Sequence, residues 1–252
     1  MNLTMIKALC VLYGLLIAVV VHADETITLV ADEWCPFTCA ENQQQGIGVD
    51  LARKFFEARG YQVVYRTAAW AEAIRLVRSG EADVLIGTVK TETPDLLFPD
   101  YHFSYSQSCF FSPVKTDWHY SGVKSLQHKV VGTINGYSYG TGIDAFIAAA
   151  LKLGTAKAYA DVSQLFSALH SGEVDVFIND RKVAEYYKAS QDIVLNYRIS
   201  GCQPLRKLFF AVSVADPQKG KKLIKLLNTS LLRGLSTSVV KNVHKQYGFH
   251  RI

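Results

Sequence analysis

The chain has 252 residues, of which 49% are hydrophobic and 19% are charged. These values are typical of a folded globular protein with one large core or two smaller ones, and they exclude a disordered chain. The net charge of +5 is spread along the sequence without a block of Lys and Arg, so no nucleic-acid partner is predicted.

The first 23 residues have the pattern of a secretory signal. A short segment ending at Lys7 carries one positive charge, and residues 8–21 are apolar. Val21 and Ala23 are small residues at the two positions that signal peptidase reads. The apolar run is shorter than the ~20 residues of a membrane span. We predict cleavage after Ala23 and a soluble periplasmic protein, with a retained N-terminal anchor as the alternative.

Four cysteines follow the predicted signal: Cys35, Cys39, Cys109 and Cys202. In an oxidising compartment they are expected to form disulfides, and three pairings are possible. In one of them Cys35 and Cys39 close a local loop, which leaves Cys109 and Cys202 to join distant parts of the chain. A zinc site is the alternative, but the histidines lack the short Cys/His spacings of such sites. We therefore predict disulfides and neither a metal nor a cofactor.

The first half of the mature chain predicts alternating strands and helices. Residues 26–31 alternate and are rich in β-formers, and a polar loop over 32–45 follows. Apolar residues at helical spacing over 49–59 stop at Gly60. The other elements of this half are a strand over 61–66, a helix over 70–78 and a strand over 83–86. Such an order predicts a parallel sheet with helices on its faces.

The second half repeats this order. Its predicted elements are a strand over 129–134, a helix over 142–153, a strand over 155–160, a helix over 162–170 and a strand over 175–178. Each half also contains a Ser-Gly-Glu-x-Asp-Val segment, at 79–84 and 171–176, where a helix ends at a glycine and a buried strand follows. The repetition predicts two similar lobes, each a mostly parallel sheet flanked by helices.

Two extended segments, 103–115 and 205–214, are candidate hinges between the lobes. The second is an apolar run interrupted by Arg206 and Lys207. The end of the chain predicts two basic amphipathic helices, over 218–235 and 238–247, that pack on the first lobe. We therefore expect lobe 1 to comprise residues 24–111 and 206–252, and lobe 2 residues 112–205.

Candidate ligand-binding residues follow from the rule that open α/β sheets bind ligands outside the carboxyl ends of their strands. Helix N-termini beside those ends favour an anion. Hydroxyl groups can bind polar atoms of a ligand, Asp180 can bind an ammonium group, and tryptophan rings can cover an apolar or cationic part. The predicted ligand-binding residues are Glu33, Trp34, Trp70, Gly87, Thr88, Lys90, Tyr137, Ser138 and Asp180.

Several of these residues have a purely structural alternative. Asp180 can cap a helix that begins at Arg181. Trp70 can be core packing, and Lys90 can be a solvated surface lysine. Trp34 lies in a polar loop, where an aromatic residue more often serves recognition.

The ordered set of motifs resembles the family 3 periplasmic solute-binding proteins. It includes Gly-Ile-Gly-Val-Asp-Leu at 46–51, the two Ser-Gly-Glu-x-Asp segments, Val-Val-Gly-Thr-Ile-Asn-Gly at 130–136 and Lys-Gln-Tyr-Gly at 245–248. The resemblance extends over residues 24–252. It implies the two-lobed type II periplasmic-binding-protein fold, with two crossovers and a small solute held between the lobes.

The resemblance also implies roles for single residues. Trp34 matches the aromatic residue that stacks on the ligand, and Gly87 and Thr88 match the lobe 1 strand end that bonds its amino and carboxylate groups. Ser138 matches the lobe 2 helix N-terminus at the carboxylate, and Asp180 the acid that holds the α-ammonium group. The family's carboxylate-binding arginine has no counterpart, because no arginine occurs between residues 79 and 180. An ordinary α-amino acid is therefore a doubtful ligand.

The favoured function is non-catalytic capture of a small polar solute by a monomer that serves an ABC permease at the inner membrane. One alternative is an enzyme resembling cyclohexadienyl dehydratase, since the same scaffold can support chemistry. Its acid or base candidates would be Glu33, Lys90, His102 and Asp180, which form no paired constellation in the sequence. The other alternative is a sensor that reports the ligand to a membrane partner.

Overall fold

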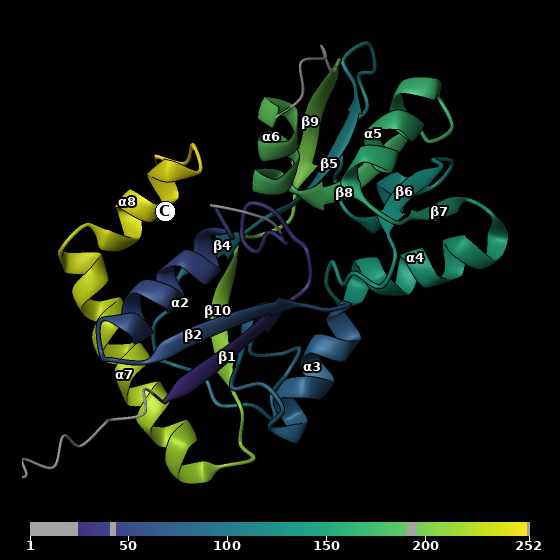
Figure 1. Cartoon of the computed structure of the whole chain (residues 1–252). Coiled ribbons are helices and arrows are strands. Elements are labelled where there is room, and N and C mark those ends of the chain that lie inside the picture. The colour runs from purple at the N-terminus through teal and green to yellow at the C-terminus, as the bar shows by residue number, and fades with distance from the viewer. Residues whose placement is uncertain (1–24, 41–43, 191–195, 251–252) are drawn as a thin grey trace, which may run out of the picture.

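The computed structural model describes residues 25–40, 44–190 and 196–250, which form two α/β lobes (Figure 1). The predicted signal sequence and its cleavage site lie outside these residues. Among the helices that are described, none combines the length and the apolar character needed to cross a membrane.

The sheet of lobe 1 has the strand order β2-β1-β3-β10-β4. β1 pairs in parallel with β2 and β3, whereas β10 is antiparallel to β3 and β4. The sheet is therefore mixed. The strands are β1 (Thr26–Ala31), β2 (Gln62–Thr67), β3 (Val84–Thr88), β4 (Ser104–Ser106) and β10 (Arg206–Val212).

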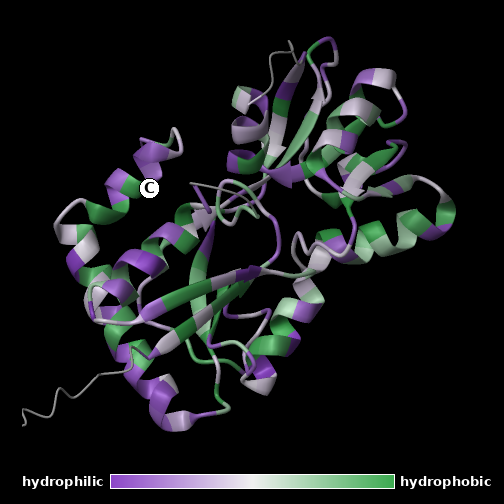
Figure 2. Ribbon diagram, viewed as in Figure 1, coloured by the Kyte–Doolittle hydropathy of each residue, from purple (hydrophilic) through white to green (hydrophobic). Residues whose placement is uncertain are grey.

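Helices cover both faces of this sheet because side chains alternate along each strand. Ile27 and Leu29 of β1 pack with the helices of one face, and Val30 packs with α3 on the other. Figure 2 shows the hydrophobic strands of this sheet between α2 and α3. The first face carries α2 (Ile47–Glu57), α7 (Pro217–Ser236) and α8 (Val239–Gln246), and α3 is Trp70–Ser79.

The sheet of lobe 2 repeats this design with the order β7-β6-β8-β5-β9. β6 is parallel to β7 and β8, and β5 is antiparallel to β8 and β9. Helices α4 and α5 cover its two faces. The elements are β5 (Ser108–Pro113), η1 (Val123–Leu126), β6 (Val131–Ile134), α4 (Thr141–Leu153), β7 (Ala156–Tyr159), α5 (Val162–Ser171), β8 (Val176–Asp180), α6 (Arg181–Ser190) and β9 (Tyr197–Cys202).

The chain crosses between the lobes at two adjacent places. The outward crossing lies at Gln107, between β4 and β5, and the return lies at residues 203–205, between β9 and β10. The expected lobe boundary at 111/112 thus falls inside β5, all of whose pairing is with strands of the second sheet. The side-chain amide of Gln107 donates to the backbone oxygen of Gln203 (3.1 Å), so the two crossings touch.

The four described cysteines form two disulfides. Cys35 pairs with Cys39, and Cys109 pairs with Cys202. The second bond joins neighbouring residues of β5 and β9, on the lobe 2 side of the crossings. Disulfides rather than a zinc site are therefore confirmed as the state of these cysteines, and the local loop and the long-range bridge both form.

The C-terminal helices pack against lobe 1 as the sequence predicts. The Tyr247 hydroxyl donates to Asp50 Oδ2 of α2 and accepts from the Gly46 backbone N–H, both at 2.7 Å. Lobe 1 is accordingly assembled from both ends of the described chain.

Candidate ligand site between the lobes

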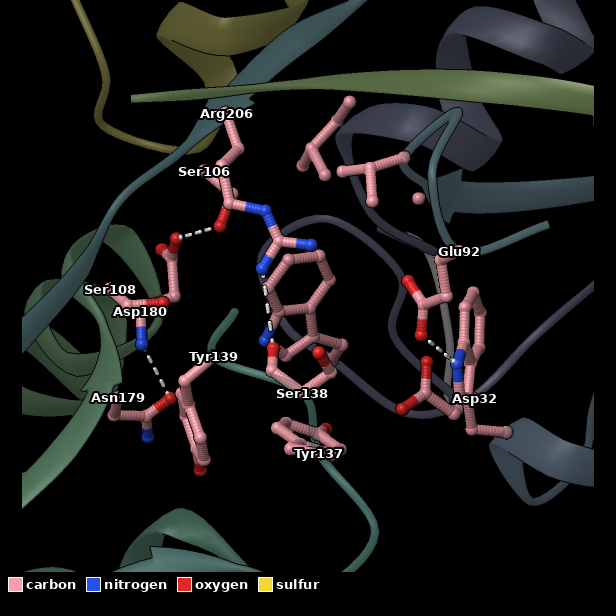
Figure 3. A pocket seen from close by; sticks show the side chains of 15 residues that line it. Asp32, Glu92, Ser106, Ser108, Tyr137, Ser138, Tyr139, Asn179, Asp180 and Arg206 are labelled. Carbon is pink, nitrogen blue, oxygen red and sulfur yellow. Dashed lines mark hydrogen bonds between the residues drawn. The ribbon is translucent and has the colours of Figure 1, made fainter. Parts of the chain in front are cut away.

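The carboxyl ends of β1 and β3 in lobe 1 face those of β6 and β8 in lobe 2 across a cavity (Figure 3). The ends of these strands and the loops that follow them supply most of its wall, and residues of α3, β4, β5 and β10 complete it. The lining residues are Asp32, Trp34, Trp70, Gly87, Val89, Glu92, Ser106, Ser108, Tyr137, Ser138, Tyr139, Asn179, Asp180, Arg206 and Leu208. The two sheets therefore enclose one shared site.

The structure brings six of the nine predicted site residues to this cavity: Trp34, Trp70, Gly87, Tyr137, Ser138 and Asp180. The other three lie elsewhere. Glu33 lines a neighbouring hollow with Cys35 and Tyr186. Thr88 is fully buried, with its hydroxyl 3.2 Å from that of Thr93. Lys90 is exposed and places its ammonium group 4.7 Å from the centre of the Phe209 ring.

Trp34 is held in place by the tight loop that follows β1. Its backbone N–H donates to the Thr38 oxygen at 2.6 Å, and the Cys35–Cys39 disulfide closes the same turn. Its ring lies 4.5 Å from that of Phe37, centre to centre. The indole Nε1 is buried and has no hydrogen-bond partner among the described residues. The loop thus presents a fixed aromatic wall with an unused donor.

Gly87 lets the end of β3 approach this wall. A Cβ at this position would lie 3.7 Å from the Trp34 ring, in ordinary contact, but the φ of +90° disfavours any residue with a side chain. The backbone of the strand end is therefore open to the cavity.

Asp180 is engaged in structural hydrogen bonds on both carboxylate oxygens. Oδ2 accepts from the Ser106 hydroxyl and from the Gln107 backbone N–H, both at 2.7 Å. Oδ1 accepts from the backbone N–H groups of Lys182 (2.7 Å) and Val183 (3.3 Å) at the start of α6. Burial raises the pKa of Asp180, while these hydrogen bonds oppose the rise. The side chain caps α6 and ties lobe 2 to the outward crossing.

An acidic region lies at the lobe 1 end of the cavity. Burial raises the pKa of Asp32 to about 6, and the charges of Glu92 and Glu33 act in the same direction, whereas a hydrogen bond from Tyr137 opposes it. Glu92 Oε1 accepts from the Trp70 indole Nε1–H at 2.8 Å. Trp70 therefore positions a carboxylate in addition to forming part of the wall.

Arg206 is a cation that lines the cavity and was not among the predicted ligand-binding residues. It is the first residue of β10, on the return crossing, and its Nη1 donates to the Ser138 backbone oxygen at 3.3 Å. This contact joins residues 68 positions apart in the chain. The only signal in the sequence is that Arg206 interrupts an apolar extended run.

Side chains of lobe 1 contact lobe 2 across the cleft at several places besides Ser106 with Asp180. Besides Arg206 with Ser138, the Tyr137 hydroxyl hydrogen-bonds to Asp32, and the rings of Tyr137 and Trp34 meet edge to face with centres 6.5 Å apart. Tyr137 therefore links the lobes at the acidic end of the cavity.

Asn179 adds another unused donor on the lobe 2 side. Its side-chain oxygen accepts from the backbone N–H of Asp180 at 2.7 Å, but its Nδ2 is buried without a partner in the part of the chain that is described. The residue is 1% exposed and lines the cavity. A buried unpaired amide donor costs stability unless a ligand or water accepts from it.

Two opposed sheets, two adjacent crossings and a polar cavity between the strand ends define the type II periplasmic-binding-protein class of fold. The family model for bacterial extracellular solute-binding proteins, family 3, matches residues 27–95. No curated protein sequence matches the chain.

Solved structures of the same fold cover nearly the whole chain. A histidine kinase sensor domain with similarity to periplasmic binding proteins has a TM-score of 0.71 at 18% identity, covering 89% of this chain and 96% of its own. An ABC uptake transporter substrate-binding protein from Streptococcus pneumoniae with bound histidine has a TM-score of 0.70 at 16% identity, covering 88% of this chain and 92% of its own. An ancestral amino-acid-binding protein, AncCDT-1, which is a precursor of cyclohexadienyl dehydratase, has a TM-score of 0.68 at 18% identity, covering 88% of this chain and 95% of its own.

The family match and the fold together confirm the resemblance to the family 3 solute-binding proteins. The extracellular character of that family agrees with export of the chain. The identities are low enough that the solved structures establish the fold alone.

Proposed function

We propose that the protein is a periplasmic solute-binding protein that captures one small polar solute between its lobes and delivers it, as a monomer, to an ABC permease at the inner membrane. The N-terminal signal would direct export, and cleavage after Ala23 would release the mature protein. The observation that carries the proposal is the cavity onto which the strand ends of both sheets converge. The two adjacent crossings at Gln107 and residues 203–205 support hinged closure around the solute.

The cavity also supplies the polar groups that such a ligand needs. Arg206 offers a guanidinium group, and Asn179 and Trp34 offer donors that have no partner among the described residues. No arginine occurs between residues 79 and 180, but Arg206 reaches the cleft from β10. It can therefore bind a ligand that carries a hydrogen-bond acceptor. Its planar guanidinium can bind a carboxylate through two donors.

Native mass spectrometry of the protein purified from its own periplasm tests the proposal. We expect one co-purified small molecule in a 1:1 complex. After removal by partial unfolding, re-addition of that molecule should raise the melting temperature by several degrees, because a ligand that binds only the folded state stabilises it. A protein that carries no solute and is stabilised by no amino acid, amine or carboxylate would contradict the proposal.

An enzyme is the second candidate, and the half-buried Asp32 favours it, because a carboxyl group with a pKa of about 6 is suited to general acid–base catalysis. Of the four acids and bases considered from the sequence, Asp180 lines the cavity, whereas Glu33, Lys90 and His102 do not. Steady turnover of prephenate or arogenate that is lost in Asp32→Asn would establish catalysis. Stoichiometric binding without turnover would leave solute capture as the function.

A further inference from the structure

More negatively charged than positively charged side chains line the cavity, and the two kinds lie in different places. Three carboxylates, Asp32, Glu92 and Asp180, face a single guanidinium, that of Arg206. In Figure 3 Asp32 and Glu92 lie on one side of the cavity, Asn179 and Asp180 lie on the opposite side, and Arg206 lies between them. Trp70 accompanies Glu92 through their hydrogen bond. The cavity therefore has an acidic end within lobe 1.

Asp180 is poorly placed to bind an ammonium group, although its family counterpart does so. Its two oxygens already accept four hydrogen bonds, and the side chain is 3% exposed. Each carboxylate oxygen offers about two acceptor sites, so little capacity remains for a ligand. An ammonium group entering the cleft needs another acceptor.

Asp32 and Glu92 retain that capacity. Glu92 uses Oε1 for Trp70, and its other oxygen has no hydrogen-bond partner among the residues the structure describes. None of the ion pairs in the described ranges includes Asp32 or Glu92. The charge of Glu92 disfavours the ionised form of Asp32. A cation between them would relieve this repulsion.

The walls at this end are suited to an organic cation. Trp34, Trp70 and Tyr137 line the same cavity, and aromatic faces attract ammonium groups once water is displaced. The buried, unpaired Nδ2 of Asn179 gives a second and independent indication of a ligand. As a donor it requires an acceptor, as does Arg206.

We infer that Asp32 and Glu92 form the ammonium site of the cleft, and that the ligand is a primary amine whose acceptor-bearing end, such as a carboxylate, faces Arg206 and Asn179. This assignment rests on the proposed solute-binding function. It places the ammonium group on lobe 1 and leaves Asp180 to hold the crossing and α6.

Matched pairs of amino acids and the corresponding acids without the amino group test the assignment. The probes are L-alanine and β-alanine against propionate, γ-aminobutyrate against butyrate, and δ-aminovalerate against valerate, together with any co-purified solute. At neutral pH we expect an amine to raise the melting temperature by several degrees, and its partner acid to have no effect at the same concentration.

Calorimetry on variants then locates the site. Asp32→Asn and Glu92→Gln should each weaken binding of the best amine by about tenfold or more, because each removes one charge from a desolvated ion pair. Glu81→Gln is the matched control. Glu81 is an exposed carboxylate that binds Arg75 outside the cavity, so its replacement should leave the affinity unchanged. Two cleft variants are used so that misfolding of one does not decide the result.

The remaining outcomes separate this inference from the proposed function. If an acid binds as tightly as its amino counterpart, or if both cleft variants retain wild-type affinity for the amine, the ammonium site is overturned while solute binding stands. The same holds if the only co-purified solute carries no amine. If no probe binds and no solute co-purifies, the proposed function fails and this inference fails with it.

Discussion

Asp32 directly follows β1, and its carboxyl group lines the cavity. This carboxyl group is harder to ionise than that of an ordinary aspartate. In the unfolded chain an aspartate ionises near pH 4, whereas burial raises the pKa of Asp32 to about 6 in the folded protein. The folded state therefore holds the proton more tightly. Folding is penalised above pH 6, and the penalty disappears below about pH 4.

We accordingly predict that Asp32→Asn stabilises the protein at neutral pH. The free energy of unfolding should rise by about 2 kcal/mol, because the variant has no charge to desolvate and can still accept from Tyr137. Urea unfolding at neutral and at acidic pH measures this, and the gain should vanish in acid. Asp95→Asn is the control, since Asp95 lies in an exposed ion pair with Arg78 and its removal should not stabilise. A gain that persists in acid would contradict the explanation.

His244 presents the opposite case. It is fully buried in α8, where Nδ1 lies 2.9 Å from the Val240 oxygen and so donates, which leaves Nε2, 3.1 Å from the Ser104 hydroxyl, to accept. Burial lowers the pKa of His244 to about 4, and the charge of Lys182 acts in the same direction. Because the unfolded histidine binds a proton near pH 6.5, stability should fall as the pH decreases from about 6.5 to 4.

The predicted loss over that range is about 3 kcal/mol. It should be measured by urea unfolding in the Asp32→Asn background, because Asp32 titrates between about pH 4 and 6 with the opposite sign. His244→Gln in the same background should remove most of the slope, whereas His170→Gln at an exposed position of α5 should retain it. A slope that survives in His244→Gln would assign it to other groups.

Among the elements, α6 connects the cleft with both lobes. Asp180 caps its first turn and holds the outward crossing, and Lys182 donates to Ser104 of β4 at 3.1 Å. Tyr186 of the same helix lies near Tyr247 of lobe 1, with ring centres 6.4 Å apart. A helix that belongs to lobe 2 is thus part of the packing at the hinge.

A comparison of two capping aspartates tests how much Asp180 contributes. Asp161 caps α5 through one exposed hydrogen bond to Gln164, so Asp161→Ala should cost about 1 kcal/mol. Asp180→Ala removes four hydrogen bonds and leaves buried donors unpaired, so it should cost about 3 kcal/mol. Denaturant unfolding measures both. Equal costs would show that Asp180 acts only as a helix cap.

The regular elements could be predicted from the sequence because their signals are local. The bounds of β1 were predicted correctly at Thr26–Ala31, and the other helices and strands of the repeated unit lie within a few residues of their predicted ranges. β9 was not predicted, because Tyr197–Cys202 alternates poorly and is stabilised by its pairing with β5. Helix α6 was considered only as a segment that Asp180 would cap.

The residues that line the cavity were harder to predict than the helices and strands. They depend on the order of the strands in each sheet and on which side chains point into the cavity where each strand ends. Asp32 and Glu33 are adjacent in sequence, yet Asp32 lines the cavity and Glu33 the neighbouring hollow. Glu92 enters the cavity through its bond to Trp70, 22 residues away. Arg206 arrives through the position of β10 beside β4, which no local pattern specifies.

At the scale of the whole molecule, the position of β10 has a consequence for the order in which the protein forms. β10 lies between β3 and β4, so the first sheet lacks an interior strand until Arg206–Val212 has been synthesised. Every strand of the second sheet precedes it in the chain. During synthesis the second lobe can therefore acquire its complete set of strands while the first still exposes the edges of β3 and β4 to solvent or to a chaperone.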